Sequence, residues 1–279
     1  MRVGGDSGKR WLYMSKGARP VPVIDISVAH SARVWNYWLG GKDNYAVDRA
    51  AGDQYRQVFP GIVDVAHSYR AFLARTVRYL AGEAGIRQFL DVGTGLPTVG
   101  NTHELAQDVS SDCRIVYVDN DPLVLVHAQA LLTSSPEGAC DYIEADLHDP
   151  GAILAGAART LDLGSPVALM LISVLGHVAD QDEALSIVRT LVAGLCPGSY
   201  LAITLGTDTN EAFSQAQRQY NASGAVPYVL RAPEQVPQFF DGLDLVEPGV
   251  VPASEWRPDS GPFTGPKQVY AFGGVGRKP

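Results

Sequence analysis

From Ala84 onward, short apolar runs rich in β-branched residues alternate with longer segments of helical periodicity. This alternation is typical of a parallel sheet covered by helices, because parallel strands need long crossovers and are buried on both faces. Pro122 is placed to open one helix, and Asp180 to cap another that stops at Pro197. The predicted strands lie at 87–92, 113–118, 140–143, 167–173 and 200–204, with two more near 243–246 and 268–272.

The segment before Ala84 has a different pattern, with helical stretches and no convincing strand. Apolar residues between 63 and 80 recur at the spacing of one helix face, and Arg70 falls in the same stripe. A buried arginine needs either an internal carboxylate or carbonyl partner or an anionic ligand, and the sequence leaves both open. We expect a flexible tail at 1–25, with Met14 as an alternative start. A helical cap at 26–83 and a core at 84–279 should form one integrated domain.

Charge and cysteine usage exclude several classes of protein. Acidic residues outnumber basic ones by 30 to 22, which gives a formal net charge of −8, and no run of consecutive basic residues occurs. Nucleic-acid and anionic-membrane partners are therefore not expected, since both require a clustered positive face. The cysteines number 3, an odd count without a CxxC pair, and the 6 histidines are scattered, so we expect reduced thiols, a cytoplasmic protein and no metal site. No apolar run is long enough to span a bilayer.

A glycine turn follows the first predicted strand. The string from Asp91 to Gly95 places Gly93, Thr94 and Gly95 at the carboxyl end of a central strand, where open α/β sheets bind ligands. A dinucleotide-binding fingerprint requires a third glycine or alanine, followed directly by a helix, at the position that Thr98 occupies in this chain. A nicotinamide cofactor is therefore disfavoured.

Acidic residues also follow the second and third predicted strands. Asp119, with Asn120 after it, stands where a carboxylate can accept both hydrogen bonds of a ribose diol. Its alternative role as a helix N-cap suits Asp121 better. Asp146 stands where it can accept from an adenine amino group, with Leu147 beside the base. Because the ends of parallel strands meet at one edge of the sheet, these residues should face one shared nucleoside.

This series, Asp91-Val92-Gly93-Thr94-Gly95, then Val118-Asp119, then Ala145-Asp146-Leu147, resembles the motifs of class I methyltransferases that use S-adenosylmethionine. The string Gly40-Gly41-Lys42-Asp43-Asn44, within 32–45, narrows the resemblance. With this string and the strand-end motifs, the sequence is similar to a bacterial methyltransferase family long catalogued as a domain of unknown function. The match extends from about Ile26 to the last strand.

The resemblance implies a Rossmann-like α/β core, that is, a mostly parallel sheet of seven strands with an antiparallel last strand, and an N-terminal helical cap. It implies S-adenosyl-L-methionine as the cofactor, with Gly93 and Gly95 near its methionine part, Asp119 near the ribose and Asp146 near the adenine. Tyr69 before Arg70, and Gly176 before His177, depart from the expected pattern. The expected cofactor-binding residues are Asp91, Gly93, Thr94, Gly95, Asp119, Asn120, Asp146, Leu147, Ser173, Arg70 and Lys42.

Roles at the acceptor end follow from the chemistry of the cofactor. Its carboxylate needs a cation, for which Arg70 or Lys42 is suited, although Lys42 can equally be a solvated residue after a helix C-cap at Gly40. Methyl transfer depends mainly on alignment, so a base is optional. If the acceptor is a hydroxyl, His177 is the first candidate for the base and Tyr37 a weaker one, the alternative for His177 being a structural bond to backbone.

We therefore expect a methyltransferase that acts on a small-molecule acceptor. The rival hypothesis is a non-catalytic protein on the same fold that binds S-adenosylmethionine or S-adenosylhomocysteine and serves as a sensor or an assembly protein. A homodimer stays open, as does the identity of the acceptor atom.

Overall fold

The computed structural model describes residues 25–131, 134–258 and 268–279. The tail expected at 1–25 and Met14 therefore lie, apart from Asp25, outside the described residues. One sheet of eight strands forms the centre, in the order β3-β2-β1-β4-β5-β8-β6, with β7 paired to β8. The strands are β1 Gln88–Val92, β2 Arg114–Asp119, β3 Ala139–Glu144, β4 Ala168–Ile172, β5 Tyr200–Gly206, β6 Asp244–Leu245, β7 Val251–Pro252 and β8 Ala271–Arg277.

The predicted fold class is confirmed, and the strand count is corrected. Strands β1 to β5 run parallel to one another, and β8 runs antiparallel to β5. The eighth strand is the short β7, which pairs with β8 at Gly273 and Phe272. The last strand begins at Ala271, later than the expected 268–272. The glycines of this strand give it no apolar pattern that could be recognised in the sequence. At Gly273 the packing requires glycine, because a Cβ there would lie 2.9 Å from the ring of Phe72.

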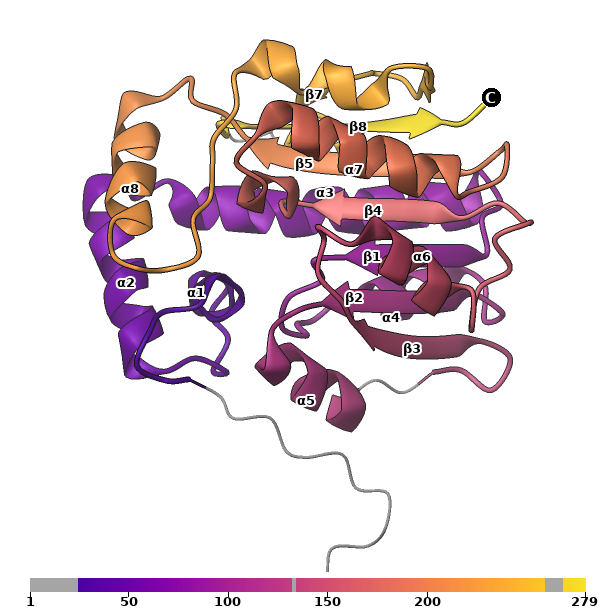
Figure 1. The fold of residues 1–279 in the computed structure, drawn as a ribbon, viewed down its shortest axis with the longest axis horizontal. Coiled ribbons are helices and arrows are strands. Elements are labelled where there is room, and N and C mark those ends of the chain that lie inside the picture. The colour runs from indigo at the N-terminus through magenta and orange to yellow at the C-terminus, as the bar shows by residue number, and fades with distance from the viewer. Residues whose placement is uncertain (1–24, 132–133, 259–267) are drawn as a thin grey trace, which may run out of the picture.

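Helices cover both faces of the sheet (Figure 1). Alternate residues of β1 enter opposite cores: Phe89 packs with α3 and α4, while Leu90 packs with α6 and α7. Asp180 accepts a hydrogen bond from the Glu183 N–H at 2.8 Å and so caps α7 as expected. The helices are α3 Ile62–Gly82, α4 Thr102–Val109, α5 Pro122–Leu131, α6 Pro150–Ala157 and α7 Gln181–Ala193, with the short 3-10 turns Leu175–His177, Pro233–Gln235 and Pro237–Phe240.

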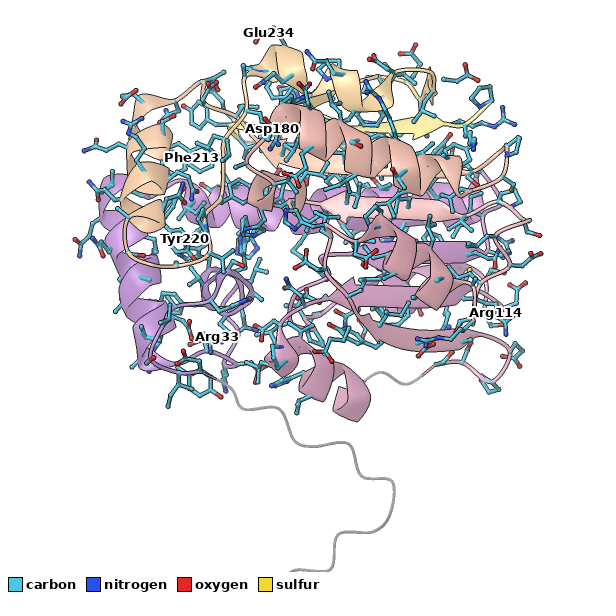
Figure 2. All side chains as sticks on the ribbon, viewed as in Figure 1. Arg33, Arg114, Asp180, Phe213, Tyr220 and Glu234 are labelled. Atoms are coloured by element: carbon cyan, nitrogen blue, oxygen red, sulfur yellow. The ribbon has the colours of Figure 1, made fainter. Side chains whose placement is uncertain are left out.

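The helices α1 Ser31–Trp38, α2 Ala46–Val58 and α8 Glu211–Asn221 lie together beyond the carboxyl ends of the parallel strands (Figure 1). Phe213 and Tyr220 of α8, labelled in Figure 2, pack against the N-terminal helices: the ring of Phe59 stacks on Phe213 with centroids 4.8 Å apart. A buried ion pair, Arg33 Nε to Asp48 Oδ1 at 3.3 Å, joins α1 to α2. No helix in the described part of the chain is both long and apolar enough to cross a membrane.

Candidate functional site

A cavity of about 330 Å³ lies where the carboxyl ends of β1, β2 and β4 and the chain after β3 meet α1 and α3. Most of the residues expected to bind a cofactor line it. They are Arg70, Asp91, Gly93, Thr94, Gly95, Asp119, Asn120, Asp146, Leu147 and Ser173, and His177 is there as well. The topology explains the gathering, because parallel strands deliver their carboxyl ends to one edge of the sheet.

The glycine turn after β1 has the geometry that only glycine adopts easily. Gly93 and Gly95 have φ angles of +73° and +66°. A Cβ on Gly93 would lie 2.2 Å from the Val174 side chain, whereas at Gly95 it would meet nothing within 4 Å. The turn is tied to the next strand, since Gly93 N–H donates to the Val118 carbonyl at 2.8 Å. Gly95 thus presents bare backbone to an open cavity.

Asp119 holds this turn and faces the cavity. Its Oδ2 accepts from Gly95 N–H at 2.8 Å, and its Oδ1 accepts from Asp121 N–H at 3.0 Å. Burial raises the pKa of Asp119, against the opposing effect of these two amides. Asp121 accepts from Leu123 N–H at 2.9 Å at the start of α5, so the capping role belongs to Asp121.

The far end of the cavity is more exposed and polar. Asn120 Nδ2 donates to Asp146 Oδ2 at 3.2 Å, which holds the second and third strand ends together. His148 contacts Asp146 Oδ1 through Nδ1 at 2.7 Å, and hydrogen bonds from its backbone N–H and its ring lower the pKa of Asp146. Leu147, 8% exposed, supplies an apolar wall beside these groups. This end of the cavity therefore combines polar side chains with an apolar wall.

A buried carboxylate and a guanidinium lie at the opposite end. Asp91 is 3% exposed and accepts from the Thr102 hydroxyl at 2.6 Å. Burial raises the pKa of Asp91 to about 6, although Thr102 and the charge of Arg70 oppose the rise. Arg70 donates through Nη2 to the carbonyls of Gly100 at 2.7 Å and Val99 at 3.3 Å. Of the alternatives left open for Arg70, the structure shows carbonyl partners, and the same side chain lines the cavity.

His177 follows β4 and is oriented by the chain opposite. Its Nδ1 lies 2.9 Å from the Pro227 carbonyl oxygen, and its ring packs edge-on against Tyr228 at 5.3 Å. Because a carbonyl only accepts, Nδ1 carries the proton when the ring is neutral, which leaves the lone pair on Nε2. Burial lowers the pKa of His177 and favours that neutral form. The structural bond to backbone and a role for Nε2 are thus compatible.

A smaller cavity of about 30 Å³ adjoins the first and shares Ser31, Trp35, Tyr69 and His177 with it. Its wall is largely aromatic, and none of the described residues that line it is Asp, Glu, Lys or Arg. The buried Tyr220 Oη has no hydrogen-bond partner there. The remaining lining residues are Val34, Trp38, Tyr55, Ile62, Val65, Phe213, Gln217, Tyr220 and Tyr228.

The structure does not bring Tyr37 and Lys42 to either cavity. Tyr37 Oη donates instead to Asp53 Oδ1 at 2.7 Å, and Lys42 is exposed in the turn after α1. Apart from Trp35, sequence reasoning did not identify the face of α1 that lines the cavity. Its members, Ala32, Trp35, Asn36 and Leu39, recur at helical spacing, which was the available signal, and His30, His148 and Val226 also line the cavity. No cluster of three or more His, Cys, Asp or Glu suited to a metal occurs within 25–131, 134–258 and 268–279.

Known proteins give this geometry a family. The chain is similar to a DUF574 family protein from Streptomyces avermitilis, at 44% identity and a TM-score of 0.88, covering 92% of this chain and 100% of that one. It is also similar to a protein from Thermobifida fusca named as a candidate methyltransferase, at 42% identity and a TM-score of 0.84, covering 93% of this chain and 98% of that one. None of the curated proteins compared with the chain matches it.

The family described as S-adenosyl methyltransferase matches residues 18–279, and its cofactor, S-adenosylmethionine, fits a cavity of strand-end acids and bare glycine backbone. This chain therefore belongs to the S-adenosyl methyltransferase family.

Proposed function

We propose that the protein transfers the methyl group of S-adenosylmethionine to a small, largely uncharged acceptor with an apolar body. The observation that carries the proposal is the pair of joined cavities. One is lined by the strand-end residues suited to the cofactor, and the other is aromatic and opens beside His177. The finer resemblance, to the family marked by the string Gly40 to Asn44, is part of the same proposal.

In this proposal the cofactor lies across the ends of the parallel strands. Asp119 accepts from the ribose hydroxyls, while Asn120, Asp146 and Leu147 surround the adenine. The backbone of Gly93, Thr94, Gly95 and Ser173 lies along the methionine part. Arg70, which is half-buried, binds the carboxylate of that part, and Asp91, which is buried, binds its ammonium group.

The acceptor is proposed to lie beside His177 and to extend only a small apolar group into the aromatic cavity, because that cavity has a volume of about 30 Å³. A charged acceptor would find no counter-ion in its wall, and burying an uncompensated charge is costly. Aromatic rings instead favour an apolar or aromatic body.

The cofactor supplies a methyl group bound to a sulfonium centre. The chain's own residues align the acceptor with it, exclude water through the cap helices and receive a proton where the acceptor is a hydroxyl. We assign that last step to His177, because its Nδ1 is held by the Pro227 carbonyl and its Nε2 keeps a lone pair. Alignment contributes most of the rate for an in-line displacement of this kind.

We also propose that 26–83 is the cap and 84–279 the core of one domain.

The test is calorimetry followed by turnover. The purified protein should bind S-adenosylhomocysteine. When it is given S-adenosylmethionine and a panel of phenols and aliphatic alcohols, it should convert the S-adenosylmethionine to S-adenosylhomocysteine. The same panel carrying carboxylates should be inactive. If the protein binds the cofactor but methylates no acceptor in the panel, the result would favour the non-catalytic alternative. A protein that binds neither nucleoside contradicts the proposal.

A further inference from the structure

The string Gly40 to Asn44 folds as a turn directly after α1 and does not deliver Lys42 to the cavity. Gly40 has a φ of +78°, and Gly41 N–H donates to the Asn36 carbonyl at 2.8 Å. Asn44 Nδ2 donates to the Gly41 carbonyl at 3.0 Å, which closes the turn on itself. The most specific string of the sequence is therefore arranged around Asn36.

The turn fixes the orientation of the Asn36 side-chain amide. Asn36 Oδ1 accepts from Asp43 N–H at 3.0 Å and from Asn44 Nδ2 at 2.9 Å. These two donors occupy both lone pairs of the oxygen, so the amide cannot be flipped without losing them. A Cβ on Gly41 would lie 2.4 Å from Asn36 Nδ2, so glycine is needed for this close approach.

The other end of the same amide has no protein partner. Asn36 is 3% exposed and lines the larger cavity, yet its Nδ2 donates to no atom of the described residues. Nδ2 is not among the fully buried atoms that lack a partner, so this donor faces the open cavity, where an oxygen of a bound ligand can accept its hydrogen bond.

The packing of α1 on α3 indicates which oxygen. The rings of Trp35 and Tyr69 lie 5.5 Å apart, and the residues that follow them, Asn36 and Arg70, both line the cavity. Arg70 commits Nη2 to the Gly100 and Val99 carbonyls. A carboxylate has about four lone-pair sites and is held best by several donors.

We propose that Asn36 Nδ2 donates a hydrogen bond to the carboxylate of the methionine part of the cofactor, beside Arg70, and that the turn at 40–44 serves to orient it. This rests on the proposed function above. It gives the Gly-Gly-Lys-Asp-Asn string a role in ligand binding that does not involve its lysine.

The test compares two ligands on matched variants. Asn36→Asp keeps an oxygen for Asp43 and Asn44 but replaces the donor with a second acceptor. Asn210→Asp makes the same chemical change at the N-cap of α8, where aspartate caps equally well and neither Asn210 nor its partner Phe213 lines the larger cavity. Calorimetry on each variant measures S-adenosylhomocysteine and its decarboxylated analogue, and thermal unfolding checks the fold.

Asn36→Asp should weaken S-adenosylhomocysteine binding by about tenfold or more while changing the decarboxylated analogue by less than about twofold. Asn210→Asp should change neither. If Asn36→Asp does not fold, Asn44→Ala, which loosens the amide, should show the same selective loss to a smaller extent. Equal losses for both ligands, or none, overturn the role of Asn36. A wild-type protein that binds neither ligand instead contradicts the proposed function.

Discussion

Asp119 serves the fold and the proposed site with the same carboxylate. Each of its oxygens accepts one backbone N–H, from Gly95 and from Asp121, and each retains a second lone pair. Replacing it with alanine should weaken the binding of S-adenosylhomocysteine by about 1 to 3 kcal/mol, because a ribose diol would lose its acceptor. Calorimetry measures this directly. Asp119→Asn, which retains one acceptor oxygen, is the control and should lose less; unchanged affinity in the alanine variant would remove Asp119 from the site.

Asp91 should make stability depend on pH. Its folded pKa of about 6 lies above the usual 3.8, so the protonated form stabilises the fold fully below pH 3.8 and this contribution is lost as pH rises through 6. Asp91→Asn, which cannot ionise, should therefore gain stability relative to wild type between pH 4 and 7, by about 3 kcal/mol at most. Urea unfolding at both pH values measures it. A difference between the two proteins that stays constant with pH would show that Asp91 does not titrate there.

The glycines of β8 illustrate how an element can be shaped by its neighbours. Gly273 lies under α3, where a Cβ would be 2.9 Å from Phe72, 3.0 Å from Thr204 Cγ2 and 3.1 Å from the Ile203 carbonyl. Gly273→Ala should therefore lower the free energy of unfolding by about 1 to 3 kcal/mol through overpacking. Gly151→Ala is the matched control, since Gly151 is exposed in α6 and alanine favours helices. Equal stability of the two variants would contradict the tight packing of β8.

Elements with strong internal patterns could be predicted, and those decided by tertiary contacts could not. The strand ends carrying Gly93, Asp119 and Asp146 were placed correctly because parallel strands share one edge. Strand β8 was misplaced because its glycines carry no apolar signal. Tyr37 and Asn36 are adjacent in α1, and the sequence alone does not tell which faces the sheet. The packing of Trp35 on Tyr69 and of Trp38 on Tyr55 fixes that rotation.

At the scale of the whole molecule, the cavity lies between the helices α1 and α3 on one side and the carboxyl ends of β1, β2 and β4 on the other. Across this boundary, His30 Nδ1 lies 2.9 Å from Asp121 Oδ2, and the His30 side chain lowers the pKa of Asp121. Helix α1 has 8 residues, too few to be stable by itself, so its order depends on tertiary contacts. A ligand that touches both α1 and the strand ends should add contacts at this boundary.

Cofactor binding should therefore protect the cap as well as the core. At a concentration of S-adenosylhomocysteine about 100 times its Kd, the free energy of unfolding should rise by about 2.7 kcal/mol. Amide hydrogen exchange should slow in α1 and in the turn at 40–44, because their openings would first require loss of the ligand. Helix α6 does not line the cavity, so its amide exchange should slow only as far as the ligand makes global unfolding rarer. Slowing confined to the strand ends, with α1 unchanged, would mean that the cap helices do not contribute to binding.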